Sequence, residues 1–150
     1  MAGHLGWVTI RITFVAVVYA GIMTAFGATS PLQGLLAVPP AVLTGAAFAA
    51  AVTAYTARLK NETGLSTLFR FGIVPLFLFS GTFFPISQLP DFIEPVAYAT
   101  PLFHGVSLCR GLALGIGFEA PWAASIAYLA LWVAVGSWLS VRVMRRRLVV

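Results

Sequence analysis

Besides the acidic residues near its ends, the largely apolar segment 91–119 carries His104 and Arg110. Ionisable groups at membrane depth are costly, and by default they are candidates for function. For His104 that function would be group transfer to a lipid, and for Arg110 it would be contact with an anionic headgroup or sugar. The simpler alternative places both at the outer membrane interface, where an arginine snorkels or pairs with Asp91 or Glu94.

The surroundings of His104 in the sequence argue against catalysis. No carboxylate or second nucleophile lies within a few residues of it on a helix face. No His, Cys or carboxylate cluster has metal-ligand spacing, and Cys109 is the single cysteine. No Gly-Lys-Ser/Thr loop is present to hold nucleotide phosphates. We therefore expect no catalytic residue, metal or cofactor in this chain, and any ATP and Mg²⁺ would belong to a partner.

The composition is that of a membrane protein. Of 150 residues, 60% are hydrophobic and 9% are charged, against about 25% charged in average soluble domains. The mean hydropathy is +0.97. The net charge of +5 comes from basic residues at the edges of apolar runs, which is how membrane proteins use positive charge. Nucleic-acid binding, which needs a basic face or stripe, is therefore not expected.

Gaps between charged residues predict a single all-α transmembrane domain. No charge occurs between Arg11 and Arg58, and one spanning helix needs about 20 residues. Ser30 can cap a second helix and Pro31 suits its first turn, while Pro39-Pro40 predicts a packing kink inside it. About four spanning helices are predicted, at 7–27, 32–57, 71–90 and 120–141.

The segment 91–119 is too short for two crossings, and a single crossing would hold Arg110 at depth. Cytoplasmic ends should carry the Lys/Arg excess. Four crossings put all basic clusters on one side and the acidic groups of 91–119 on the other. We therefore predict that 91–119 enters and leaves on the outer side as a re-entrant helical hairpin, and that both termini are cytoplasmic. Within it, Gly111-x-x-x-Gly115 permits close helix approach.

Aromatic residues fall into two groups along the predicted helices. The rings near predicted interfaces are expected to anchor the chain there; they are Trp7, Tyr55, Trp122 and Trp138. The rings inside the helices are expected to pack against protein; they are Tyr19, Tyr128 and Trp132.

The most specific stretch is Phe79-Ser80-Gly81-Thr82-Phe83-Phe84-Pro85-Ile86-Ser87-Gln88-Leu89-Pro90. It is followed by Pro95, by Pro101-Leu102-Phe103-His104 and by Leu108-Cys109-Arg110-Gly111. This order resembles the C-terminal signature of type-2 ABC export permeases, and especially the branch with nodulation-factor and daunorubicin-type exporters. The shared elements are a small-residue/Phe-Phe-Pro helix end, a Leu-Pro step, a proline starting a short helix, and an arginine soon after.

The resemblance implies a multi-pass protein of the bacterial inner membrane. Family permeases have six spans, and two short helices re-enter between the fifth and sixth. Two permease chains, identical or different, pair with each other and with an ATP-binding subunit, and they export amphipathic molecules such as lipids, glycolipids, polyketides or drugs. An outer-gate role would fall on Phe83, Phe84, Pro85, Leu89, Pro90, Pro101, His104 and Arg110. Arg145, Arg146 and Arg147 would anchor the last helix at the anionic lipid surface of the cytoplasmic side.

The first two spans of the family pattern have no counterpart in this sequence. The chain would then be a truncated reading frame, with Met1 as an internal start, or half of a split permease. Two other classes stay open. One is a small intramembrane enzyme acting on lipids, and the other is a non-transporting assembly or regulatory membrane subunit.

Overall fold

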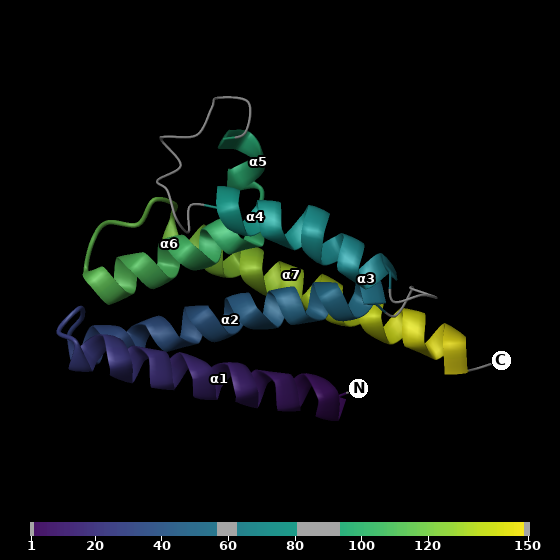
Figure 1. Ribbon diagram of the computed structural model, residues 1–150, viewed down its shortest axis with the longest axis horizontal. Helices are drawn as coiled ribbons and strands as arrows, with labels where there is room; N and C mark the ends of the chain where they lie inside the picture. The colour runs from purple at the N-terminus through teal and green to yellow at the C-terminus, as the bar shows by residue number, and fades with distance from the viewer. Residues whose placement is uncertain (1, 57–62, 81–93, 149–150) are drawn as a thin grey trace.

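The computed structural model describes residues 2–56, 63–80 and 94–148. Every regular element in these ranges is a helix (Figure 1), which confirms the all-α prediction. The elements are α1 (Ala2–Ala25), α2 (Pro31–Thr56), α3 (Thr63–Thr67), the π-helix η1 (Leu68–Ile73), α4 (Val74–Phe79), α5 (Glu94–Tyr98), α6 (Pro101–Leu114) and α7 (Trp122–Leu148).

Within the described ranges, three helices are long and apolar enough to cross a membrane. These stretches are Gly6–Ala25, Pro31–Thr56 and Trp122–Val143, close to three of the predicted ranges. The predicted helix at 71–90 runs into residues 81–93, which lie outside the described part. Its described portion starts earlier than predicted, and Gly64–Leu78 is apolar but shorter than a full span.

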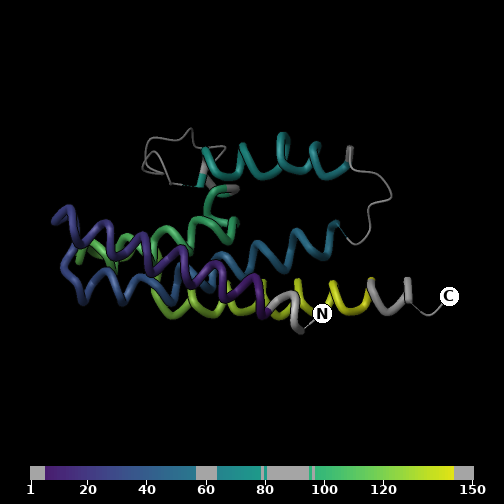
Figure 2. The backbone as a smooth tube through the Cα atoms, turned by 60° about the horizontal axis from the view of Figure 1, so that its bottom comes forward, coloured from purple at the N-terminus to yellow at the C-terminus, as the bar shows by residue number. Residues whose placement is uncertain are grey.

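Helix α2 is the centre of the packing. Helices α1, α6 and α7 all contact it, while α3, η1 and α4 run as a separate layer over the long helices (Figure 2). Glycines permit two of the close approaches. A Cβ atom on Gly45 would lie 2.9 Å from Ile12 of α1, and one on Gly136 of α7 would lie 2.8 Å from the Ala50 Cβ. Small residues at such contacts are typical of membrane helix packing, where apolar attraction between helices adds little over lipid.

Helix α1 contacts only one side of the bundle. None of its apolar window is buried, and Trp7 and Phe14 are 63% and 70% exposed. In a membrane protein lipid covers such a surface. Tyr19 is also 63% exposed, so within this chain it does not pack against protein as predicted. Its helix carries apolar residues all round, so the sequence could not show which face met α2.

The turn between α1 and α2 follows the predicted capping chemistry. Gly27 has a φ of +72°, a conformation that glycine adopts without steric cost. The Gln33 backbone N–H donates to Ser30 Oγ at 3.3 Å, and the Ser30 backbone N–H donates to Gln33 Oε1 at 3.3 Å. These reciprocal bonds form a capping box. They confirm Ser30 as the cap of α2, with Pro31 in its first turn.

Two helices run through positions at which the sequence predicts a kink or the end of a span. Helix α2 runs through Pro39 and Pro40 as one continuous helix, and the packing kink at these residues stays a prediction. Helix α7 extends past 141 to Leu148, through the terminal arginines. Arginine is a good helix former, so the arginine run marks where the apolar stretch ends and not where the helix ends.

Candidate functional site

The candidate site is built on α6, a helix shorter than a full membrane span. Its 14 residues extend about 21 Å at the α-helical rise. Pro101, at its start, lines a cavity together with Ala47 in the middle of α2. Near its end, the Thr29 hydroxyl donates to the Ala113 carbonyl at 2.5 Å. Helix α6 therefore begins at mid-height of the bundle and ends beside the α1–α2 turn.

The start of α6 is fixed by its own sequence. The Thr100 hydroxyl accepts from the Phe103 backbone N–H at 3.3 Å and donates to the Ala97 carbonyl at 2.7 Å. Pro101 occupies the first turn, where its missing N–H costs nothing. The Thr100 cap satisfies a backbone donor that lipid could not, so α6 can start well inside the apolar part of the molecule.

His104 links α6 to α7. Its Nδ1 lies 3.0 Å from the Ser125 hydroxyl oxygen, and its ring centroid lies 4.6 Å from that of Tyr128. The Tyr128 hydroxyl in turn donates to the Ala99 carbonyl at 2.5 Å. Ser125 and Tyr128 share one face of α7 at a spacing of three residues. This face of α7 therefore contacts both ends of the Ala99–His104 stretch.

This arrangement gives His104 the second polar group that the sequence did not reveal, since Ser125 lies 21 residues away. Ser125 is 0% exposed, however, and a nucleophile must reach its substrate. The Ser125 hydroxyl is hydrogen-bonded to His104 Nδ1 in the buried contact between α6 and α7. No group of three or more His, Cys, Asp or Glu side chains that could hold a metal occurs in the described parts of the chain. The geometry suits a positioning contact better than a catalytic pair.

Gly105 brings α6 against α2. A Cβ atom on Gly105 would overlap the Thr44 side chain, whose hydroxyl donates to the Pro40 carbonyl at 2.7 Å. The predicted Gly111-x-x-x-Gly115 approach is a different contact. Gly111 faces Phe118 of the following loop. Gly115, which follows α6 with a φ of +65°, lies close to α2, because a Cβ atom there would lie 2.8 Å from Gln33 Nε2. One glycine of the predicted pair therefore lies against another helix, and glycine spacing alone could not identify which one.

The other half of α6 carries Arg110 and Ser107. Arg110 is half-buried, and its proposed acidic partners, Asp91 and the Glu94 side chain, lie outside the described residues. The Ser107 hydroxyl accepts from the backbone N–H groups of Glu119 and Ala120 at 3.1 and 3.3 Å. These bonds fold the 115–121 loop back onto α6, so the segment that follows the helix is held beside it.

Several predicted site residues lie outside the described part of the structure. They are Phe83, Phe84, Pro85, Leu89 and Pro90, so their outer-gate role stays a prediction. Arg145, Arg146 and Arg147 lie in the backbone of α7, and their side chains are not described. One turn earlier, the Arg142 guanidinium lies 5.0 Å from the centroid of the Trp138 ring, a cation–π contact at the basic end of the helix.

Comparison with known families decides what this architecture belongs to. Residues 2–114 match the model of the ABC-2 type transporter family, a stretch that runs from the start of α1 to the end of α6. The chain belongs to the ABC-2 type transporter family. The matched region of this ABC-2 chain includes the whole of α6 with Pro101, His104 and Arg110, which confirms the family resemblance of the Phe-Phe-Pro to Arg110 pattern.

This ABC-2 chain is similar to several proteins named Nodulation protein J. The chain is 31% identical to Nodulation protein J of Sinorhizobium fredii, over 97% of its own length and 55% of the length of that protein. It is 28% identical to Nodulation protein J of Rhizobium leguminosarum bv. trifolii and of Rhizobium meliloti, with the same coverage. The chain therefore spans about half the length of the curated relatives it matches. No solved structure matches the chain significantly.

Proposed function

We propose that this ABC-2 family chain forms part of the membrane permease of an ATP-driven exporter. The observation that carries the proposal is the placement of α6 inside the family-matched region. A capped helix shorter than a full span starts at mid-height and ends beside the α1–α2 turn. Irregular backbone at membrane depth is tolerated only against protein or a wet cavity, so such a segment is suited to the wall of a transport path.

Energy and partners would come from other chains in this proposal. An ABC ATP-binding subunit would bind ATP and Mg²⁺, and its motion would open a path between this permease and a second permease chain, identical or different. The chain itself would hold no cofactor and catalyse no reaction. Support comes from the family match and from the absence of a phosphate-binding Gly-Lys-Ser/Thr loop in the sequence.

The proposed location is the bacterial inner membrane, with both termini cytoplasmic. The start of α1, the end of α2 and the end of α7 lie at one end of the bundle, and the α1–α2 turn lies at the other (Figure 1). Arg142 and the backbone of the terminal arginines belong to the first end. The positive-inside rule assigns that end to the cytoplasm. The end of α6 would then face outward, as the outer-gate role requires.

The proposed substrates are amphipathic, such as lipids, glycolipids or drugs. Similarity to Nodulation protein J and the resemblance to lipo-oligosaccharide exporters support this class. Arg110, half-buried on α6, is proposed to contact an anionic headgroup or sugar. Replacing Arg110 with Gln should lower export of an anionic amphiphile, while Arg110→Lys should retain most of it. Unchanged export in Arg110→Gln would remove this role.

A pull-down tests the proposal as a whole. The chain would be tagged at its C-terminus in its native genomic locus, extracted in gentle detergent and probed for an ATP-binding subunit. We expect such a subunit to co-purify and its ATPase activity to respond to amphiphiles. If the chain purifies intact without one, the assembly-subunit and enzyme classes gain support. A His104→Ala strain that loses a lipid product while export stays intact would favour the enzyme.

A further inference from the structure

We infer that the cavity between α2, η1–α4, the start of α6 and α7 is a binding site for a single hydrocarbon chain. The cavity has a volume of about 240 Å³. An engineered apolar protein cavity of about 150 Å³ is already large enough to bind benzene. The lining from Ala47 to Tyr55 of α2 extends about 12 Å at the α-helical rise. A volume of about 240 Å³ spread along about 12 Å makes a space that is longer than it is wide, which suits a run of methylene groups.

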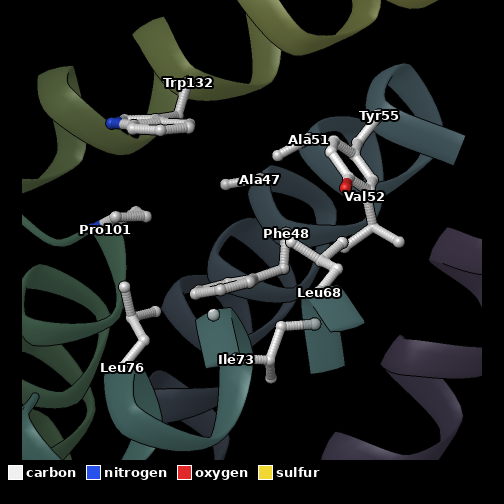
Figure 3. Close-up of a pocket in the computed structure, with 11 residues that line it drawn as sticks. Ala47, Phe48, Ala51, Val52, Tyr55, Leu68, Ile73, Leu76, Pro101 and Trp132 are labelled. Atoms are coloured by element: carbon white, nitrogen blue, oxygen red, sulfur yellow. The ribbon is translucent and has the colours of Figure 1, made fainter. Parts of the chain in front are cut away.

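The chemistry of the lining points to the same ligand. Among the described residues, it is made of aliphatic and aromatic side chains from four parts of the chain, and the polar side-chain atoms in this set are the Tyr55 hydroxyl and the Trp132 indole nitrogen. Figure 3 shows Trp132 and Pro101 on one side of the space and Ile73 and Leu76 on the other. Water has too few partners there to enter favourably, and in a membrane the medium at this depth is hydrocarbon.

The wall formed by η1 is unusual in its backbone. Residues Leu68–Ile73 form a π-helix, and π-helical turns in α-helices occur frequently at functional sites. Three residues of this turn line the cavity: Leu68, Gly72 and Ile73. Gly72 presents no side chain to the space, and a Cβ atom there would lie 3.2 Å from Leu68 Cδ1. The π-helix thus leaves open a space that a larger side chain would narrow.

The occupant is the acyl chain of an amphiphile, and two sources share this chemistry. One is a bilayer phospholipid, and the other is a single-chain amphiphile of the class proposed for export. The inference does not depend on transport, because it concerns what fills the cavity. Trp132 supplies a reporter within the lining, since bromine atoms on a hydrocarbon chain quench indole fluorescence at contact.

The experiment uses the whole chain in nanodiscs with Trp132 as its single tryptophan, through Trp7→Phe, Trp122→Phe and Trp138→Phe. The probes are phosphatidylglycerol with a mid-chain dibrominated acyl group, and dibromostearate added to unbrominated nanodiscs. A second chain keeps only Trp138, which is 58% exposed, and reports bulk lipid. Ala51→Leu fills the cavity, Ile73→Phe fills it from the η1 side, and Ala127→Leu makes the same change as Ala51→Leu at an exposed site of α7.

We expect Trp132 to be quenched and its quenching to fall by about half in Ala51→Leu and in Ile73→Phe, because the larger side chain takes the space of the brominated chain and keeps it out of contact with the indole. Ala127→Leu should leave it unchanged, and Trp138 should respond to none of these variants. Quenching by the phospholipid probe alone identifies bilayer lipid as the source, and quenching by dibromostearate identifies a single-chain amphiphile. Equal quenching of Trp132 in the filled and unfilled chains, or no quenching by either probe, would overturn the inference.

Discussion

Helix α6 and the η1–α4 segment are both short elements beside α2, and they are held in different ways. Polar bonds and a glycine contact hold α6: His104 to Ser125, Thr29 to Ala113, and Gly105 against Thr44. Segment η1–α4 meets the long helices through apolar side chains around a cavity. Lipid can replace an apolar contact at little cost, but it cannot replace a hydrogen bond. The comparison indicates that specific contacts fix α6 against α2 and α7, whereas η1–α4 shares an apolar cavity with the long helices.

The largest expected effect comes from Gly105. Gly105→Ala places a methyl group in the space of the Thr44 side chain, and overpacking of this kind costs about 2 kcal/mol. The midpoint of thermal unfolding in detergent should fall clearly. Gly117→Ala is the matched control, because nothing lies within 4 Å of the added atom.

Combining Gly105→Ala with Thr44→Gly should restore part of the lost stability, because it removes the atoms that clash. If Gly105→Ala is as stable as Gly117→Ala, the contact between Gly105 and Thr44 does not hold α6 against α2. The proposed difference between α6 and η1–α4 would then be contradicted.

A smaller effect is expected at the link between α6 and α7. Ser125→Ala removes the hydroxyl that contacts His104 Nδ1, and the loss of one buried hydrogen bond costs about 1 kcal/mol. Unfolding in SDS, followed by circular dichroism, measures the change. Ser66→Ala, at an exposed position of α3, should leave the unfolding curve in place. A Ser125→Ala curve that overlays the wild type would show that this contact does not hold α6.

The smallest effect is expected beside the η1–α4 cavity. Ala51→Leu adds three carbons where the cavity has room, so the free energy of unfolding should change by less than about 0.5 kcal/mol. Its neighbour Ala50 is 1% exposed, and Ala50→Leu should destabilise the chain through overpacking against Gly136. Similar losses in the two variants, measured by the same SDS unfolding, would mean that the two sides of α2 are packed equally tightly.

The sequence predicts the parts of this fold that depend on local chemistry. The uncharged run between Arg11 and Arg58 and the Ser30-Pro31 cap place the first two long helices to within a few residues, because length, charge and capping act over short distances. The position of 91–119 relative to the basic residues predicts a segment that does not cross, and α6 has the length of such a segment.

The contacts that fix α6 are not predictable in this way. His104 meets Ser125, Gly105 meets Thr44, and Tyr128 meets Ala99, across separations at which no sequence spacing specifies a neighbour. The exposure of Tyr19 could not be predicted from the sequence either. Its helix is apolar all round, so nothing in the sequence separates its protein-facing side from its lipid-facing side. The Phe83 to Pro90 pattern identifies the family, and its part in the gate stays a prediction.

The central claim is that α6 ends on the same side of the membrane as the α1–α2 turn, opposite the end of α2. Single cysteines at Ala28→Cys, Thr56→Cys and Glu119→Cys, all at exposed positions and in a Cys109→Ala background, test it with a membrane-impermeant maleimide on intact cells. The account predicts that Ala28→Cys and Glu119→Cys react from outside, and that Thr56→Cys reacts only after permeabilisation. Labelling of Glu119→Cys on the same side as Thr56→Cys would contradict it, because the segment before α7 would then cross the membrane.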